Sequence, residues 1–97
     1  MRIIHTPRAL ADLDEIADYL KPRSSQGAKR VRSAILETLQ HLVQHPRIGR
    51  LQTVDTVRKI GTRKYPYLIY YSIDENADEI VVPTIQHSAR VREFTDA

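Results

Sequence analysis

Two neighbouring stretches decide the fold of this chain: KYPYLIYYSI at residues 64–73 and EIVVPTIQHSAR at residues 79–90. Aromatic and β-branched residues of this density are typical of strands, so the sequence predicts a strand over residues 65–73, the longest of the chain, and a partner over residues 80–86. The polar residues 74–78 predict a hairpin loop with Asn76 in the left-handed region. Pro83 removes a backbone donor from the second strand, which predicts a bulge or an unpaired edge there.

The tyrosines of the first of these strands are expected to divide between the two faces of the sheet, because side chains alternate along a strand. Tyr67 and Tyr71 share one face and are expected in the core. Tyr70 points the other way and is expected on the open face or at the sheet end. Stacking of RNA bases on Tyr65 or Tyr70 is an alternative to an ordinary structural role.

Two amphipathic helices are predicted before this hairpin. Thr6 is a hydroxyl N-cap followed by proline at the first helical position, and Pro22 ends that helix. Ser24-Ser25 offers the next N-cap, and the second helix is expected to run to about His45. Apolar stripes at helical spacing mark the buried faces: Leu10, Leu13, Ala17 and Leu20 in the first helix, and Ala28, Val31, Ile35, Leu39 and Leu42 in the second.

The remaining segments complete one α+β domain over residues 1–97. Short strands are expected at residues 2–5 and 57–62, with a loop at residues 46–56 whose flexible point is Gly49. The order β-α-α-β-β-β predicts an N-terminal helical hairpin packed on one face of a mainly antiparallel sheet. Residues 88–97 are expected to form a short helix or a mobile tail.

Positive charge is concentrated in the middle of the chain, which has a net charge of +3. Between residues 46 and 64, Asp55 is the single acid among six basic residues: Arg47, Arg50, Arg58, Lys59, Arg63 and Lys64. Such a local field suits a large anionic partner, or a protein that handles one, although a solvated loop is the simpler interpretation.

Composition excludes several classes of site. The chain has no cysteine, so it has no disulfide and no thiolate ligand or nucleophile. It has no apolar run of membrane-spanning length and no signal-like apolar segment, so we expect a cytoplasmic protein without a membrane partner. His41 and His45 lie one helical turn apart but lack a third ligand nearby, so we expect no metal. The chain is too small for both a core and a deep enclosed pocket, so we also expect no cofactor.

Across essentially its whole length, the chain resembles the RelE/ParE superfamily of toxins from type II toxin–antitoxin systems. The motifs that carry the resemblance are Thr6-Pro7 with Ala9-x-x-Asp12-Leu13, His45-Pro46-x-x-Gly49-Arg50, Val57-Arg58-Lys59-Ile60, residues 65–71 (YPYLIYY) and Ile85-x-His87-x-x-Arg90. The match is closer to the ParE branch, chiefly through residues 64–71 and the His-x-x-Arg ending.

The resemblance to the ParE branch implies a protein that inhibits DNA gyrase, and so replication, without being an enzyme. It also implies a cognate antitoxin that wraps and neutralises the toxin, and operator DNA bound only through that antitoxin. The residues expected to bind the target are Arg58, Arg63, Lys64, Tyr70, His87 and Arg90.

The RelE branch implies the alternative, a ribosome-dependent mRNA endoribonuclease. RNA cleavage needs an acid, a base and cations for the charge on phosphorus. Here His87 would be the acid or base, and the phosphate clamps would be Arg58, Arg63 and Arg90. At the position where such nucleases have an arginine early in the long strand, this chain has Tyr67. This difference favours gyrase as the target over mRNA cleavage. A strand-end histidine bonded to nearby backbone is the structural alternative for His87.

Overall fold

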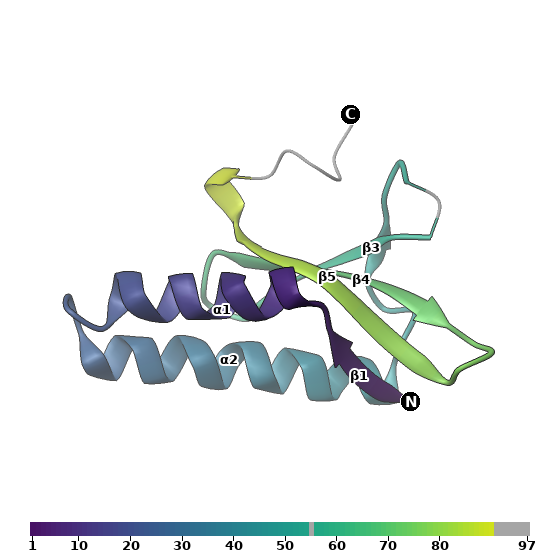
Figure 1. The fold of residues 1–97 in the computed structure, drawn as a ribbon, viewed down its shortest axis with the longest axis horizontal. Helices are drawn as coiled ribbons and strands as arrows, with labels where there is room; N and C mark the ends of the chain where they lie inside the picture. The colour runs from purple at the N-terminus through teal and green to yellow at the C-terminus, as the bar shows by residue number, and fades with distance from the viewer. Residues whose placement is uncertain (55, 91–97) are drawn as a thin grey trace.

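In the computed structural model, which describes residues 1–54 and 56–90, two helices pack against one five-stranded sheet (Figure 1). The elements are β1 (Arg2–His5), α1 (Pro7–Leu20), α2 (Ser25–Gln44), β2 (Arg50–Leu51), β3 (Arg58–Gly61), β4 (Tyr67–Asp74), β5 (Glu79–His87) and a 3₁₀ turn, η1 (Ser88–Arg90). The strand order is β1-β5-β4-β3-β2, with β1 parallel to β5 and the other pairs antiparallel. The predicted α+β class and mainly antiparallel sheet are confirmed. The predicted tail from residue 91 onward lies outside the described residues.

Both helices begin at the predicted caps. Thr6 Oγ1 accepts a hydrogen bond from the Ala9 N–H at 3.1 Å, and Pro7 occupies the first helical position. Ser24 Oγ accepts from the Gly27 N–H at 2.9 Å. Each cap satisfies a donor that the helix leaves unpaired and contributes about 1 kcal/mol. Neither helix of the described chain is long and apolar enough to cross a bilayer.

The core lies between the helices and one face of the sheet. All five residues of the predicted α2 stripe are buried. The predicted α1 stripe is wrong at Leu10, whose side chain is 51% exposed, whereas Ala9 is fully buried. Helix α1 instead presents Ala9, Leu13, Ile16 and Leu20 to the core, a stripe with the same helical spacing but rotated around the helix.

The sheet departs from the sequence prediction in three places. Strand β2 pairs with β3 inside the predicted loop, and two residues are too short to show any periodicity. Among the described strands β5 is the longest, with nine residues against eight in β4. The left-handed residue of the β4–β5 hairpin is Asp78 (φ 56°) rather than Asn76.

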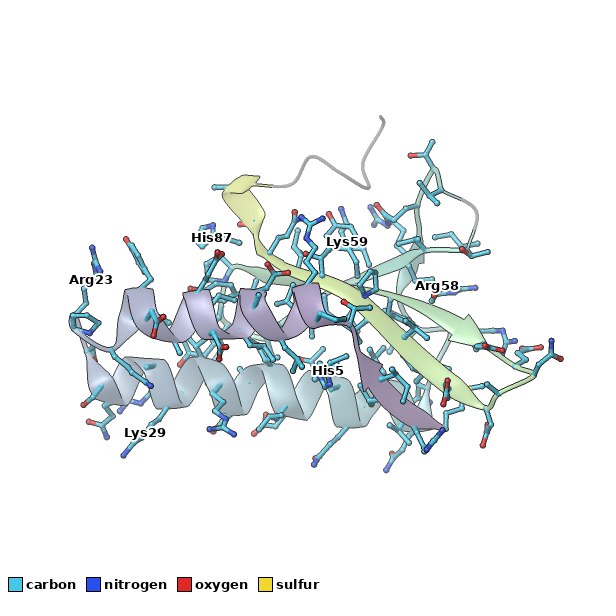
Figure 2. The ribbon with its side chains drawn as sticks, viewed as in Figure 1. His5, Arg23, Lys29, Arg58, Lys59 and His87 are labelled. Carbon is cyan, nitrogen blue, oxygen red and sulfur yellow. The ribbon has the colours of Figure 1, made fainter. Side chains whose placement is uncertain are left out.

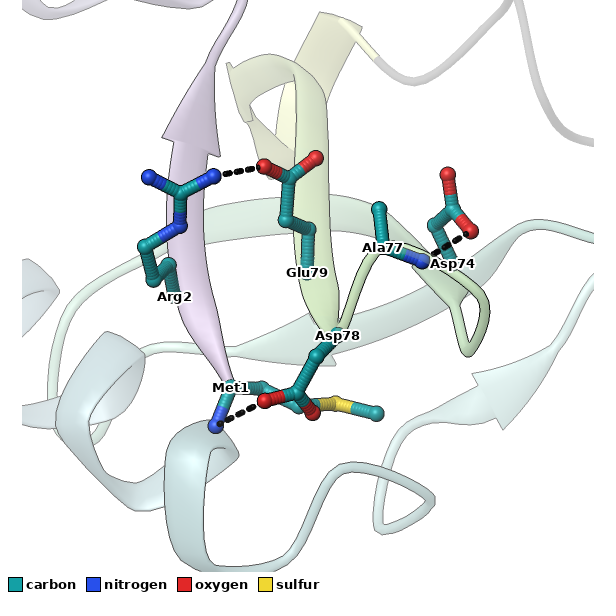
Figure 3. A network of polar contacts seen from close by, with 6 residues as sticks. All are labelled: Met1, Arg2, Asp74, Ala77, Asp78 and Glu79. Carbon is teal, nitrogen blue, oxygen red and sulfur yellow. Dashed lines mark hydrogen bonds and ion pairs between the residues drawn. The ribbon is translucent and has the colours of Figure 1, made fainter.

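Polar contacts tie β1 to this hairpin (Figure 3). The Arg2 guanidinium pairs with the Glu79 carboxylate, and the Met1 amino group lies 3.9 Å from the Asp78 carboxylate. Within the hairpin, Asp74 Oδ1 accepts from the Ala77 N–H at 3.0 Å. In each ion pair one partner, Asp78 or Arg2, is exposed to solvent, so the pairs add little stability, but the contacts fix where the hairpin lies relative to β1.

The bulge predicted near Pro83 is confirmed. The register of β4 and β5 shifts between the pairs Tyr70↔Thr84 and Ser72↔Val81, so β5 holds one extra residue there. Proline is tolerated at such a point because the missing N–H falls where regular pairing is already interrupted.

Candidate functional site

Arg58 holds a loop at one end of β3. Its Nη1 donates to the backbone carbonyls of Arg47 (3.1 Å) and Gly49 (2.9 Å). Arg58 is paired with Tyr71 across the sheet, so both side chains stand on the helix-covered face. The predicted contact of Arg58 with a target stays a prediction, and the structure gives its guanidinium a separate structural task.

Tyr71 holds the same loop through its side-chain hydroxyl. Its hydroxyl donates to the Pro46 carbonyl at 2.7 Å and accepts from the Gly49 N–H at 2.8 Å. A Cβ on residue 49 would lie 2.5 Å from the Tyr71 hydroxyl, so only glycine fits. Burial raises the pKa of Tyr71, and the Gly49 hydrogen bond and the nearby Arg58 partly oppose that rise. The sequence predicts Gly49 to be a flexible point, but its backbone is held by a hydrogen bond and close packing against Tyr71.

His87 closes β5 at the opposite end of the sheet. Its ring meets Tyr67 edge to face, with centroids 5.3 Å apart, and the residue is exposed. His87 Nδ1 accepts from the Ala89 N–H at 3.1 Å, which is the strand-end arrangement that the sequence left open as a structural alternative. Tyr67 is buried as predicted; burial raises its pKa, with Tyr19 adding to the rise.

Tyr70 is fully buried, so the expectation that it lies on an open face or at the sheet end is wrong. It sits in the middle of a central strand, paired with Lys59 on β3 and Thr84 on β5. Burial also raises the pKa of the Tyr70 phenol.

Arg63 and Lys64 are exposed on the turn between β3 and β4. Thr62 builds the turn, because its hydroxyl donates to the Tyr65 (2.8 Å) and Tyr67 (3.1 Å) carbonyls. Lys64 occupies the left-handed region at φ 72°, a conformation that costs a non-glycine residue about 1 kcal/mol.

The predicted site residues fall into two groups. The Arg63–Lys64 turn and His87 share the sheet end at Tyr67, whereas Arg58 is paired with Tyr71, four residues further along β4. At about 3.3 Å per residue, that is about 13 Å away. Figure 2 shows His87 and Arg58 well apart over the sheet. The backbone of Arg90 follows in η1, and its side chain lies outside what the structure describes.

A groove that sequence reasoning missed lies between α2 and the β3–β4 turn; we call it the α2 groove. Its volume is about 580 Å³. The residues that line it are Gln26, Lys29, Arg30, Ser33, Ala34, Glu37, Arg63, Lys64 and Tyr65. The sequence places Lys29 and Arg30 off the apolar stripe of their helix, but no local signal shows that they face a turn more than thirty residues later.

His41 and His45 are neighbours near the C-terminal end of α2. The rings of His41 and His45 lie with centroids 4.9 Å apart. Within residues 1–54 and 56–90, no cluster of three or more histidine, cysteine, aspartate or glutamate side chains could hold an ion.

Comparisons with known proteins agree with this architecture. Residues 3–92 match the family model described as the ParE toxin of the type II toxin–antitoxin system parDE. Toxin RelE2 of Caulobacter vibrioides is 34% identical over 90 residues, covering 93% of this chain and 98% of that protein. Among solved structures, the chromosomal ParDE TA system from P. aeruginosa superimposes with a TM-score of 0.77 at 26% identity, covering 90% of this chain and 95% of that one. The intact E. coli RelBE toxin–antitoxin complex gives 0.64 at 17% identity, covering 89% and 94%, and shows the common fold.

Proposed function

Because the chain belongs to the ParE toxin family of type II toxin–antitoxin systems, we propose that it inhibits DNA gyrase, and so replication, until a cognate antitoxin neutralises it. The protein acts by binding rather than by catalysis. Its contact surface includes His87, Arg63 and Lys64 at one end of the sheet, together with Arg90. The match to the ParE family model and the likeness to a solved ParDE system support this branch.

The observation that carries the proposal is the separation of the residues that a nuclease would need together. Arg58 donates to two loop carbonyls, about 13 Å along β4 from the position opposite His87. A general acid or base acts only within hydrogen-bond reach of the atom it serves, and a phosphate clamp must face the same phosphate. This arrangement suits a distributed binding surface better than a compact catalytic centre.

A specific observation favours the second candidate, a ribosome-dependent mRNA endoribonuclease. The relative named RelE2 is 34% identical to this chain. His87 is exposed on the same sheet end as the Arg63–Lys64 turn. In that function His87 would exchange the proton, and Arg63 and Arg90 would hold the phosphate.

An antitoxin partner is part of the proposal. The ParDE and RelBE structures that share this fold are toxin–antitoxin assemblies, which supports a cognate antitoxin here. The complex binds operator DNA through the antitoxin, and the toxin acts in the cytoplasm, where both candidate targets lie.

Two assays on the purified protein separate the candidates. The first measures inhibition of gyrase supercoiling on relaxed plasmid, and the second maps mRNA ends by primer extension on translating ribosomes. We expect inhibited supercoiling with intact mRNA. If mRNA is instead cut in phase with its codons while gyrase is unaffected, the protein is an endoribonuclease and not a gyrase inhibitor.

A further inference from the structure

We propose that the α2 groove is a binding site for the phosphodiester backbone of a nucleic acid. The groove shares Arg63 and Lys64 with the proposed contact surface at the sheet end that carries His87, and it adds Lys29 and Arg30 of α2 to the contact residues. The proposal does not depend on which target the toxin has, because gyrase on DNA and the translating ribosome both present phosphodiesters.

The first support is the number of cations that two separate elements bring together. Lys29 and Arg30 come from α2, and Arg63 and Lys64 come from the β3–β4 turn, whereas Glu37 is the single carboxylate among the described lining residues. All four cations are exposed. Lys29 is labelled on the lower side of α2 in Figure 2.

The second support is that these four cations have no carboxylate partner. Within residues 1–54 and 56–90, none of them forms an ion pair or a side-chain hydrogen bond. Two cations outside the groove do form ion pairs, Arg2 with Glu79 and Arg47 with Glu75. Like charges held close together oppose folding, and a bound polyanion would relieve that repulsion.

Local backbone geometry points the same way. Lys29 and Arg30 lie in the second turn of α2, which begins at Ser25, on the helix that forms one wall of the groove. Lys64 reaches the groove from a left-handed turn position at φ 72°. An unfavourable backbone conformation that carries a charged side chain is often held for a binding purpose.

The lining suits a nucleic acid better than an acidic peptide. A peptide gains specificity from apolar pockets or from an open strand edge, and Ala34 is the single aliphatic side chain among the described lining residues. Phosphate contacts, in contrast, use long flexible cations of this kind. Tyr65 is half-buried in the groove and offers a ring on which a sugar or base can pack.

The test measures binding of fluorescently labelled duplex DNA and single-stranded RNA, each about 20 nucleotides long, by anisotropy between about 50 and 200 mM salt. The variants are Lys29→Gln with Arg30→Gln, and Arg63→Gln with Lys64→Gln. The matched control is Lys21→Gln with Arg32→Gln, which removes the same charge from exposed positions outside the groove.

We expect each groove variant to lose about tenfold in affinity at about 100 mM salt, and the control to lose much less. The slope of log K against log salt should become shallower by about 0.9 per removed contact for duplex DNA and about 0.7 for single strands. Groove dependence with one probe alone would identify that nucleic acid as the ligand, and dependence with both would support the shared backbone chemistry. Thermal unfolding checks folding, and the swap Lys29→Arg with Arg30→Lys should keep binding.

Two results would overturn the proposal. The first is equal weakening by the groove and control variants, which would show a diffuse field rather than a site. The second is retained nucleic-acid binding in groove variants that have lost binding to a poly-glutamate peptide, which would assign the groove to an acidic protein segment.

Discussion

At the scale of single residues, Tyr71 links the sheet to the loop before β2. Its hydroxyl uses both of its hydrogen-bonding roles on backbone groups, those of Pro46 and Gly49, while Arg58 holds two further carbonyls of the same loop. The loop is therefore fixed by one buried side chain, Tyr71, and one partly buried side chain, Arg58, although the sequence predicts Gly49 to be its flexible point.

Gly49→Ala tests this link. The added Cβ would lie 2.5 Å from the Tyr71 hydroxyl, so the loop must shift and its two hydrogen bonds must weaken. We expect a loss of about 1–3 kcal/mol in the free energy of unfolding, measured by urea denaturation. Gly61→Ala is the control, because its Cβ would come no closer than 3.8 Å to Leu68. Equal stability of the two variants would contradict this picture of the loop.

The buried tyrosines predict loss of stability in alkali. Burial raises the pKa of Tyr67, Tyr70 and Tyr71 above the ordinary value of 10.0. The unfolded chain therefore releases these protons first, so their contribution is complete below about pH 10 and is lost as the pH rises through the folded-state pKa values. Urea denaturation across that range should show falling stability, and Tyr67→Phe should make the fall shallower. A flat profile to about pH 11 would disagree.

At the scale of elements, α1 and its N-cap supply hydrogen-bond partners to the part of the β5 edge that β1 does not reach. β1 pairs with β5 only as far as Val82, and the edge of β5 beyond it would otherwise be bare. The Thr6 hydroxyl donates to the Val82 and Pro83 carbonyls, at 3.1 and 3.0 Å. Six residues further along the chain, the Asp12 carboxylate accepts from the Thr84 hydroxyl (2.6 Å) and the Ile85 N–H (3.0 Å).

Asp12→Ala should therefore lower the free energy of unfolding far more than the loss of an exposed acidic residue on the same helix. It would leave the Ile85 N–H and the buried Thr84 hydroxyl without their acceptor, at an expected cost of about 1–3 kcal/mol in the free energy of unfolding. Asp14→Ala, at an exposed position of the same helix, should change stability by less than about 0.5 kcal/mol. Thermal unfolding of the pair gives the comparison, and similar losses would refute the role given to Asp12.

Features that depend on near neighbours could be predicted from the sequence, and features that depend on distant pairing could not. The caps at Thr6 and Ser24 and the bulge at Pro83 are local, and each is confirmed. Three other features depend on which strands and turns become neighbours: strand β2, the burial of Tyr70, and the position of Lys29 and Lys64 along one groove. The same limit applies to the site. The sequence groups Arg58 and His87 as members of one site, but the strand register places them opposite different residues of β4, Tyr71 and Tyr67.

At the scale of the whole molecule, a 97-residue chain has a modest core, so a partner that binds only the folded form can add substantially to its stability. If the antitoxin binds only the folded toxin, it should raise the melting temperature in proportion to the logarithm of its free concentration. At about a hundred times the dissociation constant, the added stability is about 2.7 kcal/mol. Thermal shift with increasing cognate antitoxin measures this, and an unchanged midpoint at saturation would exclude selective binding to the folded form.

We propose that the protein acts on gyrase by binding through a distributed surface. The most direct measurement is the amount of linear plasmid trapped in gyrase–DNA cleavage complexes by the wild type and by His87→Ala. We predict trapped breaks with both proteins, and less than about a tenfold decrease for His87→Ala, because one contact among several is lost. The contradictory result is no trapped breaks with the wild type, together with mRNA cleavage on ribosomes that falls about a hundredfold or more in His87→Ala.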